Sequence, residues 1–278
     1  MTRERHESLN CVTVGGKSLE VLLCQPAFAQ ETIVLLHEAL GSVSYWKDFP
    51  DKLSAATGCT VLAYSRAGHG NSQGPLEPRN QKYYQNQVEA VLPALLDHFH
   101  VESPVLYGHS EGAVIALLYA AQEPQKVRAL IAEAPVLTPE PRSRNRIREL
   151  AATYPVSELK NKLVRYHNDS EAVFHSWIAG VTSPQMVQFP LDMYLPKIIC
   201  PVLLLQGSED EFGGSTQLHA IQKYLPHAQC EVLTGAGHLP HRDKTDVVIE
   251  KVRIFLSSLS PAVQQCPVVS HPPLVIPE

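Results

Sequence analysis

The 278-residue chain lacks a long apolar run, a stripe of basic residues and any closely spaced pair of cysteines. No apolar stretch approaches the ~20 residues that a membrane-spanning helix needs, and the polar segment 1–10 lacks the apolar core of a signal peptide. A formal net charge of −5 without a basic stripe argues against a nucleic-acid partner. We therefore expect a cytoplasmic monomer or homodimer that acts on a small molecule and binds neither membranes nor nucleic acid.

The six cysteines are scattered, at positions 11, 24, 59, 200, 230 and 266. None forms a pair with the spacing of metal ligands, and a chain of this length needs no disulfide framework to fold. We therefore expect reduced cysteines, no metal and no cofactor. Hydrophobic residues make up 44% of the chain, which is enough for one large core.

Short apolar runs alternate with longer amphipathic stretches along most of the chain. Two runs flank Gly15-Gly16 and predict a β-hairpin. The later runs are continuous, as in strands buried on both faces of a parallel sheet. Together with helices between them, they predict a twisted, mostly parallel α/β sheet flanked by helices. The expected strands are 11–14, 19–24, 32–36, 60–64, 104–107, 129–132 and 201–205, and the expected helices are 80–99, 112–122, 215–225 and 244–259.

One interval breaks this alternation, because no strand pattern occurs between Pro135 and Cys200. The interval is aromatic and helical in pattern. An insertion at this point would lie over the C-terminal edge of the strands, where sites in open α/β sheets lie. We interpret residues 137–196 as a helical lid inserted after the sixth strand. Residues 1–136 and 197–258 then form the core domain, and residues 259–278 form a proline-rich tail.

The segment 108–112, Gly-His-Ser-Glu-Gly, matches the pattern Gly-x-Ser-x-Gly between an apolar strand and a helix-forming run. In this pattern the serine lies on a sharp, strained turn from strand to helix, and the glycines are required because a Cβ atom would clash there. The bare pattern is only suggestive, but the strand before it and the helix after it sharpen the signal. We predict that Ser110 is a nucleophile.

A serine hydroxyl needs a neighbouring base to become a nucleophile near neutral pH. His238 is the best candidate, because it lies on a loop after the last expected strand. A carboxylate should hold its imidazole in the right tautomer. Asp210 follows the strand 201–205 and is our choice, with the adjacent Glu209 as the alternative. The resulting chain order of serine, acid and histidine is the order expected with this serine motif.

The oxyanion that forms when the serine attacks a carbonyl needs two backbone amide donors. The turn at the serine aims the amide of Glu111 at this oxyanion, and the second donor should come from the loop after the strand 32–36. We assign the second donor to Ala39, with Leu40 as the alternative. We expect the ring of His37 to brace this loop.

The remaining histidines give weaker signals. His241 lies three residues after His238, but no third ligand with suitable spacing accompanies the pair, so we expect a surface or supporting role and not a metal site. His109 flanks the serine and should point away from it. Packing or surface roles are expected for His69, His167 and His175.

Taken in order, these segments resemble the α/β-hydrolase superfamily. Residues 37–39 look like its His-Gly-aromatic oxyanion segment, residues 64–72 its Asp-x-x-Gly-x-Gly-x-Ser turn, and residues 207–210 its acid turn. The resemblance covers about residues 10–258 and implies the α/β-hydrolase fold. Within the superfamily the chain looks like lid-bearing esterases, proline iminopeptidases and carbon–carbon bond hydrolases.

Two residues depart from the superfamily pattern. Glu38 stands where glycine is usual, which puts a carboxylate beside the oxyanion loop, and Ser65 stands where aspartate is usual. Haloalkane dehalogenases and epoxide hydrolases carry aspartate as the nucleophile, so Ser110 argues against both.

The predicted function is that of a serine hydrolase that cleaves a small-molecule carboxylic ester, or a related acyl bond, through an acyl-enzyme. The alternatives are a carbon–carbon bond hydrolase or aminopeptidase-type hydrolase of the same fold, and a non-catalytic homologue that binds a small molecule.

The substrate is only weakly indicated. Candidates for an apolar pocket are Trp46, Tyr166, Trp177 and Phe189, although such aromatic residues more often pack in cores. Glu38 and Glu111 beside the serine favour a cationic or amine-bearing substrate. The arginines at positions 142, 144, 146 and 148 would attract an anionic substrate, although such a run is more often a solvated helix face.

Overall fold

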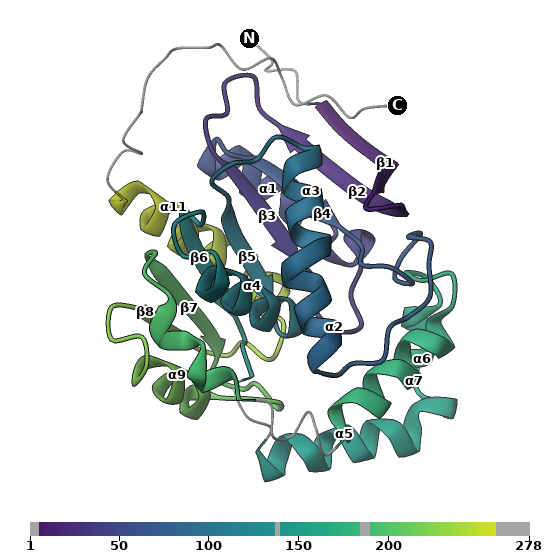
Figure 1. Cartoon of the computed structure of the whole chain (residues 1–278). Helices are drawn as coiled ribbons and strands as arrows, with labels where there is room; N and C mark the ends of the chain where they lie inside the picture. Colours follow the sequence, from purple (N-terminus) through teal and green to yellow (C-terminus); the bar gives the residue numbers. More distant parts are fainter. Residues whose placement is uncertain (1–5, 137–139, 184–189, 260–278) are drawn as a thin grey trace.

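A computed structural model describes residues 6–136, 140–183 and 190–259, without the side chains of residues 6–8 and 142. An eight-stranded sheet crosses the molecule, with helices on both of its faces (Figure 1). Its strands are β1 (His6–Val14), β2 (Lys17–Gln25), β3 (Thr32–Leu36), β4 (Thr60–Tyr64), β5 (Val105–His109), β6 (Ala129–Glu133), β7 (Val202–Gly207) and β8 (Gln229–Leu233).

The strand order is β1-β2-β4-β3-β5-β6-β7-β8. β2 pairs antiparallel with both β1 and β4, and every other neighbouring pair is parallel. Gly15 and Gly16 form the turn between β1 and β2 with φ of 55° and 76°, a conformation that favours glycine. The mostly parallel α/β sheet expected from the sequence is confirmed, as is its N-terminal hairpin.

The helices follow the predicted alternation. The stretch 80–99 forms α2 and α3 joined by a π-helical turn at 87–91. The sequence analysis did not anticipate α1, a short helix with Pro50 in its first turn, where proline is tolerated. The bounds are α1 (Phe49–Thr57), α2 (Gln81–Asn86), α3 (Leu92–His98), α4 (Glu111–Gln122), α5 (Pro141–Thr153), α6 (Glu158–Leu163), α7 (Ser170–Val181), α9 (Ser215–Gln222), α10 (Pro240–Asp243) and α11 (Thr245–Ser258).

Alternate side chains of the central strands enter two separate cores. Val34 and Leu36 of β3 point into a core formed with α3, α4 and α9. Ile33 and Leu35 point into the other core, formed with α1 and α11. The helices α2, α3 and α4 cover the face of the sheet turned toward the viewer in Figure 1. A strand buried on both faces in this way explains the continuous apolar run at 32–36.

The insertion between β6 and β7 contains α5, α6 and α7, which lie together at one end of the molecule (Figure 1). Their apolar side chains form a third cluster, in which the rings of Tyr154 and Phe174 stack with centroids 3.5 Å apart. Ala39 and Leu40, from the loop after β3, belong to the same cluster. The insertion therefore packs on the loop that was expected to hold the oxyanion. Its role as a lid stays a prediction, and its edges at 137–139 and 184–189 lie outside the described residues, as do residues 260–278 of the tail.

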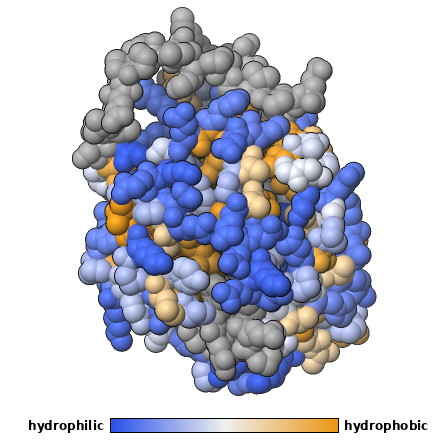
Figure 2. All heavy atoms as spheres, viewed as in Figure 1, coloured by the Kyte–Doolittle hydropathy of each residue, from blue (hydrophilic) through white to orange (hydrophobic). Residues whose placement is uncertain are grey.

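Hydrophilic residues predominate on the face seen in Figure 2, and apolar residues show there as small separate areas. Within the described ranges, every helix is either too short or too polar to cross a membrane.

His37 is buried at the end of β3 and links two loops. Its Nε2 accepts the amide of Arg66 at 3.0 Å, so Nδ1 carries the proton and donates to the carbonyl of Glu38 at 2.6 Å. Burial and the nearby charge of Arg66 hold the pKa of His37 well below 6.5. The ring is therefore neutral in the folded protein at mildly acidic pH.

This arrangement predicts a pH-dependent stability. Below pH 6.5 the unfolded chain protonates His37 while the folded chain does not, so the free energy of unfolding falls as the pH falls. A glutamine keeps an acceptor near the position of Nε2 but does not titrate. We expect His37→Gln to remove about 2 kcal/mol of the stability difference between about pH 7 and about pH 5, measured by urea unfolding. Parallel pH profiles for the variant and the wild type would contradict this assignment.

Candidate active site

Ser110 lies at the junction of β5 and α4, with φ of 52° and ψ of −113°. A residue other than glycine rarely adopts this backbone conformation, and it marks a strained turn. A Cβ atom at Gly112 would collide with the carbonyl of Leu36, and one at Gly108 would collide with the carbonyl of Gly112. The two glycines therefore allow α4 to approach β3 and β5 closely enough to form the turn.

The structure brings together the three residues predicted to act with one another. His238 Nε2 lies 3.0 Å from Ser110 Oγ, and His238 Nδ1 lies 2.8 Å from Asp210 Oδ2. Ser110 follows β5, Asp210 follows β7 and His238 follows β8. All three therefore lie beyond the C-terminal ends of parallel strands, where sites of open α/β sheets form.

Asp210, and not Glu209, contacts the imidazole. Asp210 is buried and also accepts the amides of Phe212 at 2.8 Å and Gly213 at 3.2 Å, whereas Glu209 is exposed. Burial alone would raise the pKa of Asp210, but the hydrogen bond and charge of His238, with these two amides, lower it below 3.8. The group therefore stays ionised beside the ring.

The imidazole of His238 is more basic than an ordinary histidine. Burial alone would lower its pKa, but the hydrogen bond and charge of Asp210 outweigh this effect. The charges of Glu38 and Glu211 raise it further, and the resulting pKa lies above 6.5. A more basic imidazole accepts a proton from a hydroxyl more readily.

The two amides predicted to hold an oxyanion border the same cavity as Ser110. Ala39 and Glu111 both line it, and neither amide donates to a hydrogen-bond acceptor among the described residues. The amide of Glu111 begins α4, where backbone donors are not used within the helix. Leu40 lines the cavity as well, and it has no partner for its amide among those residues either.

The side chain of Glu111 is engaged in a buried ion-pair network. Its Oε2 lies 2.8 Å from Arg66 and its Oε1 lies 2.8 Å from Arg79. Burial alone would raise the pKa of Glu111, but the two guanidinium groups lower it below 4.5. Its charge is therefore balanced within the protein, and the idea that Glu111 attracts a cationic substrate is not supported.

The same arginines fix the oxyanion loop. Arg66 donates to the carbonyl of Glu38 at 2.7 Å, and Arg79 donates to the carbonyl of Ala39 at 2.8 Å. Through Glu111 the loop after β3 is thus connected to the start of α4. Sequence reasoning missed Arg79, because its loop before α2 carries no recognisable pattern.

Ser65, which departs from the superfamily pattern, is compensated by a carboxylate from another strand. Its hydroxyl donates to Glu20 of β2 at 2.6 Å and accepts the amide of Val43 at 2.8 Å. Glu20 also accepts the side chain of Asn71 at 2.6 Å. Glu20 therefore supplies, from β2, the negative charge that the usual aspartate would place in this turn.

A cavity of about 520 Å³ opens beside Ser110 and His238. Of the predicted substrate residues, Glu38 and Trp177 line it. Trp46 does not, because it packs in the core beside Phe49 and His241. Tyr166 is not in the lining either and contacts Tyr45 edge-on. Phe189 and the side chain of Arg142 lie outside the described residues.

The other arginines of α5 are placed differently from one another. Arg146 lines the cavity and pairs with Glu149 at 3.4 Å, and Arg148 donates to Asn145 on the exposed side of the helix. Of the described side chains in the run, Arg148 is exposed, Arg144 and Arg146 are partly buried, and Arg146 lies at the cavity.

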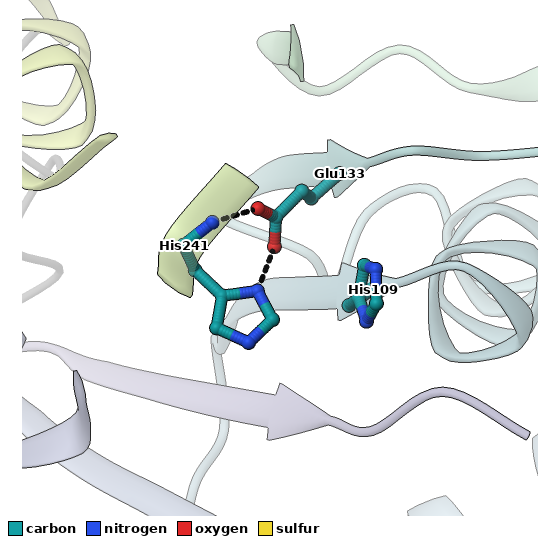
Figure 3. Close-up of side chains that lie close together, drawn as sticks. All are labelled: His109, Glu133 and His241. Atoms are coloured by element: carbon teal, nitrogen blue, oxygen red, sulfur yellow. Dashed lines mark hydrogen bonds and ion pairs between the residues drawn. The ribbon is translucent and has the colours of Figure 1, made fainter. Parts of the chain in front are cut away.

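His109, Glu133 and His241 form a second buried cluster behind His238 (Figure 3). Glu133 accepts the amide of His241, its Nδ1 at 2.8 Å and the hydroxyl of Tyr107 at 3.0 Å. His109 Nε2 donates to the backbone carbonyl of His238 at 2.7 Å. Residues of these types can bind a metal ion, but here the carboxylate is already filled by three protein donors. Glu133 was missed in the sequence, although a charged residue ending an apolar strand is a usable signal.

Comparison with known proteins identifies the family of the chain. A sequence model of the alpha/beta hydrolase family matches residues 33–251. Monoglyceride lipase of Rattus norvegicus is 24% identical in an alignment that covers 88% of this chain and 89% of the lipase. The sn-1-specific diacylglycerol lipase ABHD11 of Xenopus laevis is 26% identical in an alignment that covers 81% of this chain and 80% of that lipase.

Solved structures show the same fold at lower identity. A 2-hydroxy-6-oxo-6-phenylhexa-2,4-dienoate hydrolase from Rhodococcus sp. strain RHA1 superposes with a TM-score of 0.75 at 18% identity and covers 92% of this chain and 100% of that one. Naproxen esterase from Bacillus subtilis superposes with a TM-score of 0.68 at 20% identity and covers 92% of each chain. Since the family match spans most of the sequence, the chain belongs to the alpha/beta hydrolase family.

Proposed function

We propose that the chain is a serine hydrolase that cleaves a small-molecule carboxylic ester through an acyl-enzyme on Ser110. One observation carries the proposal: the hydrogen-bonded series from Ser110 Oγ through His238 to Asp210, with distances of 3.0 and 2.8 Å. The curated relatives include two proteins named as lipases, which supports an ester as the substrate. The largely apolar lining of the cavity supports an apolar acyl or alcohol group.

In the acylation step, Ser110 Oγ bonds to the carbonyl carbon of the ester while its proton passes to His238 Nε2. The carbonyl oxygen becomes an oxyanion, and the amides of Ala39 and Glu111 donate hydrogen bonds to it. Asp210 stabilises the imidazolium that forms. His238 then gives its proton to the departing alcohol oxygen, and the carbon–oxygen bond of the ester breaks.

In the deacylation step, water replaces the alcohol. His238 takes a proton from this water, the hydroxide oxygen bonds to the acyl carbon, and the bond to Ser110 Oγ breaks as the proton returns to the serine. The products are one carboxylic acid and one alcohol per ester and water consumed. Nothing in this cycle requires a cofactor.

The first test removes the nucleophile and separates the two candidate acids. We expect a fluorophosphonate probe to label the wild type but not Ser110→Ala, and we expect Ser110→Ala to lower kcat on p-nitrophenyl esters by about 10⁴-fold or more. Asp210→Asn should lower kcat by about 10⁴-fold, because the imidazole loses its orienting charge. Glu209→Gln is the matched control and should stay within about twofold, as is usual for an exposed side chain. Greater damage from Glu209→Gln than from Asp210→Asn would overturn the choice of acid.

The second test uses the pH dependence of turnover. The base must be neutral to accept a proton, so kcat/KM should fall as the pH drops through the pKa of His238, which lies above 6.5. In Asp210→Asn the charge that raises the pKa of His238 is gone, so burial should lower this pKa. The acid limb of the remaining activity of Asp210→Asn should therefore move to lower pH. An acid limb in the same place for both enzymes would argue that another group is the base.

A further inference from the structure

We propose that Glu38 and Glu211 form a binding subsite for an ammonium group of the substrate, an inference that rests on the proposed function. Both residues line the cavity that Ser110 and His238 border. Glu38 belongs to the oxyanion loop after β3, and Glu211 follows the acid Asp210 after β7. The two carboxylates therefore approach the cavity from different loops beside the reacting hydroxyl.

Neither carboxylate is bound by another side chain among the described residues. No donor hydrogen-bonds to the side-chain oxygens of Glu38 or Glu211 within the part of the chain that the structure describes, and neither forms an ion pair there. Arg66 and Arg79 both bind Glu111, so the charge of Arg66 acts on Glu38 without contacting its carboxylate. Glu38 thus differs from Glu111, which forms two ion pairs.

An ionised carboxylate without a partner is unfavourable in free energy when it borders a mostly apolar cavity. Burial raises the pKa of Glu38 above 4.5, which is the expected response of such a group. A cationic ligand removes the cost, since an ammonium group donates hydrogen bonds and supplies the missing charge. An anionic ligand would increase it.

Arg79 lines the cavity but is paired with Glu111, and the other cations of the lining lie on the insertion. Arg146 of α5 is already paired with Glu149, and Lys162 of α6 is exposed to water. Solvent screens these two charges more than that of Glu38, which is partly buried. The lining therefore favours positive charge on the substrate close to the scissile carbonyl.

A matched pair of substrates tests the subsite. p-Nitrophenyl 3-aminopropanoate and p-nitrophenyl butanoate differ only in a terminal ammonium or methyl group, which lies close to the scissile carbonyl. We expect the wild type to show a kcat/KM about tenfold higher for the ammonium ester, and Glu38→Gln to bring the ratio close to one. Glu211→Gln should reduce the ratio in part. Glu209→Gln removes one negative charge from the same loop without touching the cavity and should keep the full preference.

A wild type that prefers the ester with the terminal methyl group would overturn the subsite. So would a preference for the ammonium ester that survives in Glu38→Gln. Failure of the proposed function gives a different result, because then neither ester is turned over and the fluorophosphonate probe does not label Ser110. The ratio is measured within each folded variant, so a general loss of activity does not mimic the effect.

A second inference comes from the hydrogen bonds behind the base. The geometry points to His109 and the pair of Glu133 and His241 as positioning residues that hold the loop carrying His238. His109 donates to the carbonyl of His238 at 2.7 Å. Three residues further on, His241 is tied to Glu133 through both its amide and its ring. Figure 3 shows Glu133 and His109 at the ends of neighbouring strands, with Glu133 directed at His241.

These contacts hold the backbone near the base, whereas Asp210 holds its imidazole ring. His109 binds the carbonyl of His238, and Glu133 binds the amide of His241. Burial lowers the pKa of His109 to about 3, so its ring is neutral and Nε2 keeps the proton that it donates. A displacement of about 1 Å at a reacting group can cost about 100-fold in rate.

The test compares a substitution that keeps the donor with one that removes it. Glutamine places an amide N–H near the position of Nε2, whereas methionine fills the space without a donor. We expect His109→Met to lower kcat by roughly 10- to 100-fold with little change in KM, and His109→Gln to recover most of the loss. His241→Asn and His241→Leu form a second such pair, because asparagine places a donor near the position of Nδ1.

The melting temperature of each variant separates positioning from folding. A folded His109→Met enzyme with the wild-type kcat would overturn the inference, and so would equal losses for His109→Gln and His109→Met. If the methionine variant does not fold, the same comparison between the two His241 variants decides the question.

Discussion

The left-handed backbone at Ser110 is the constraint on which the rest of the site depends. The turn exists because Gly108 and Gly112 let α4 press against the sheet, where any Cβ atom would meet a backbone carbonyl. In this turn the first amide of α4 has no hydrogen-bond acceptor among the described residues. The proposed nucleophile and the proposed oxyanion donor are thus produced by one local geometry.

Carboxylates that are buried or partly buried surround this turn, and they differ in their partners. Glu111 is neutralised by two arginines and holds the oxyanion loop in place. Asp210 is paired with the imidazole, and Glu133 is paired with His241 behind it. Glu38 and Glu211 are left for a ligand. Groups of one chemical type therefore serve as structural anchor, orienter and recognition element, according to their partners alone.

Much of the fold could be predicted because the apolar runs and the glycines act locally. The run at 32–36 is apolar on both faces, and a central parallel strand is the structure that buries both. Helix α1 was missed because nine residues carry too little periodicity to stand out. The order of Ser110, Asp210 and His238 along the chain was readable for a similar reason, since each residue follows a strand.

The electrostatic partners could not be predicted, because they join residues that are far apart in sequence. Glu20 compensates Ser65 from another strand, and Arg79 reaches Glu111 from a loop without a motif. The same limit explains why Trp46 was expected in the substrate pocket although it packs in the core. Spacing reveals which residues share a face of one element, but not which elements meet.

The most direct test of the account is to trap the covalent intermediate. The enzyme is mixed with p-nitrophenyl acetate, quenched in acid and digested, and its peptides are weighed by mass spectrometry. An acetyl group is expected on the peptide that contains Ser110, with a burst of p-nitrophenol where deacylation is slower than acylation. Acetylation at another residue, or turnover that Ser110→Ala retains in full, would contradict the mechanism.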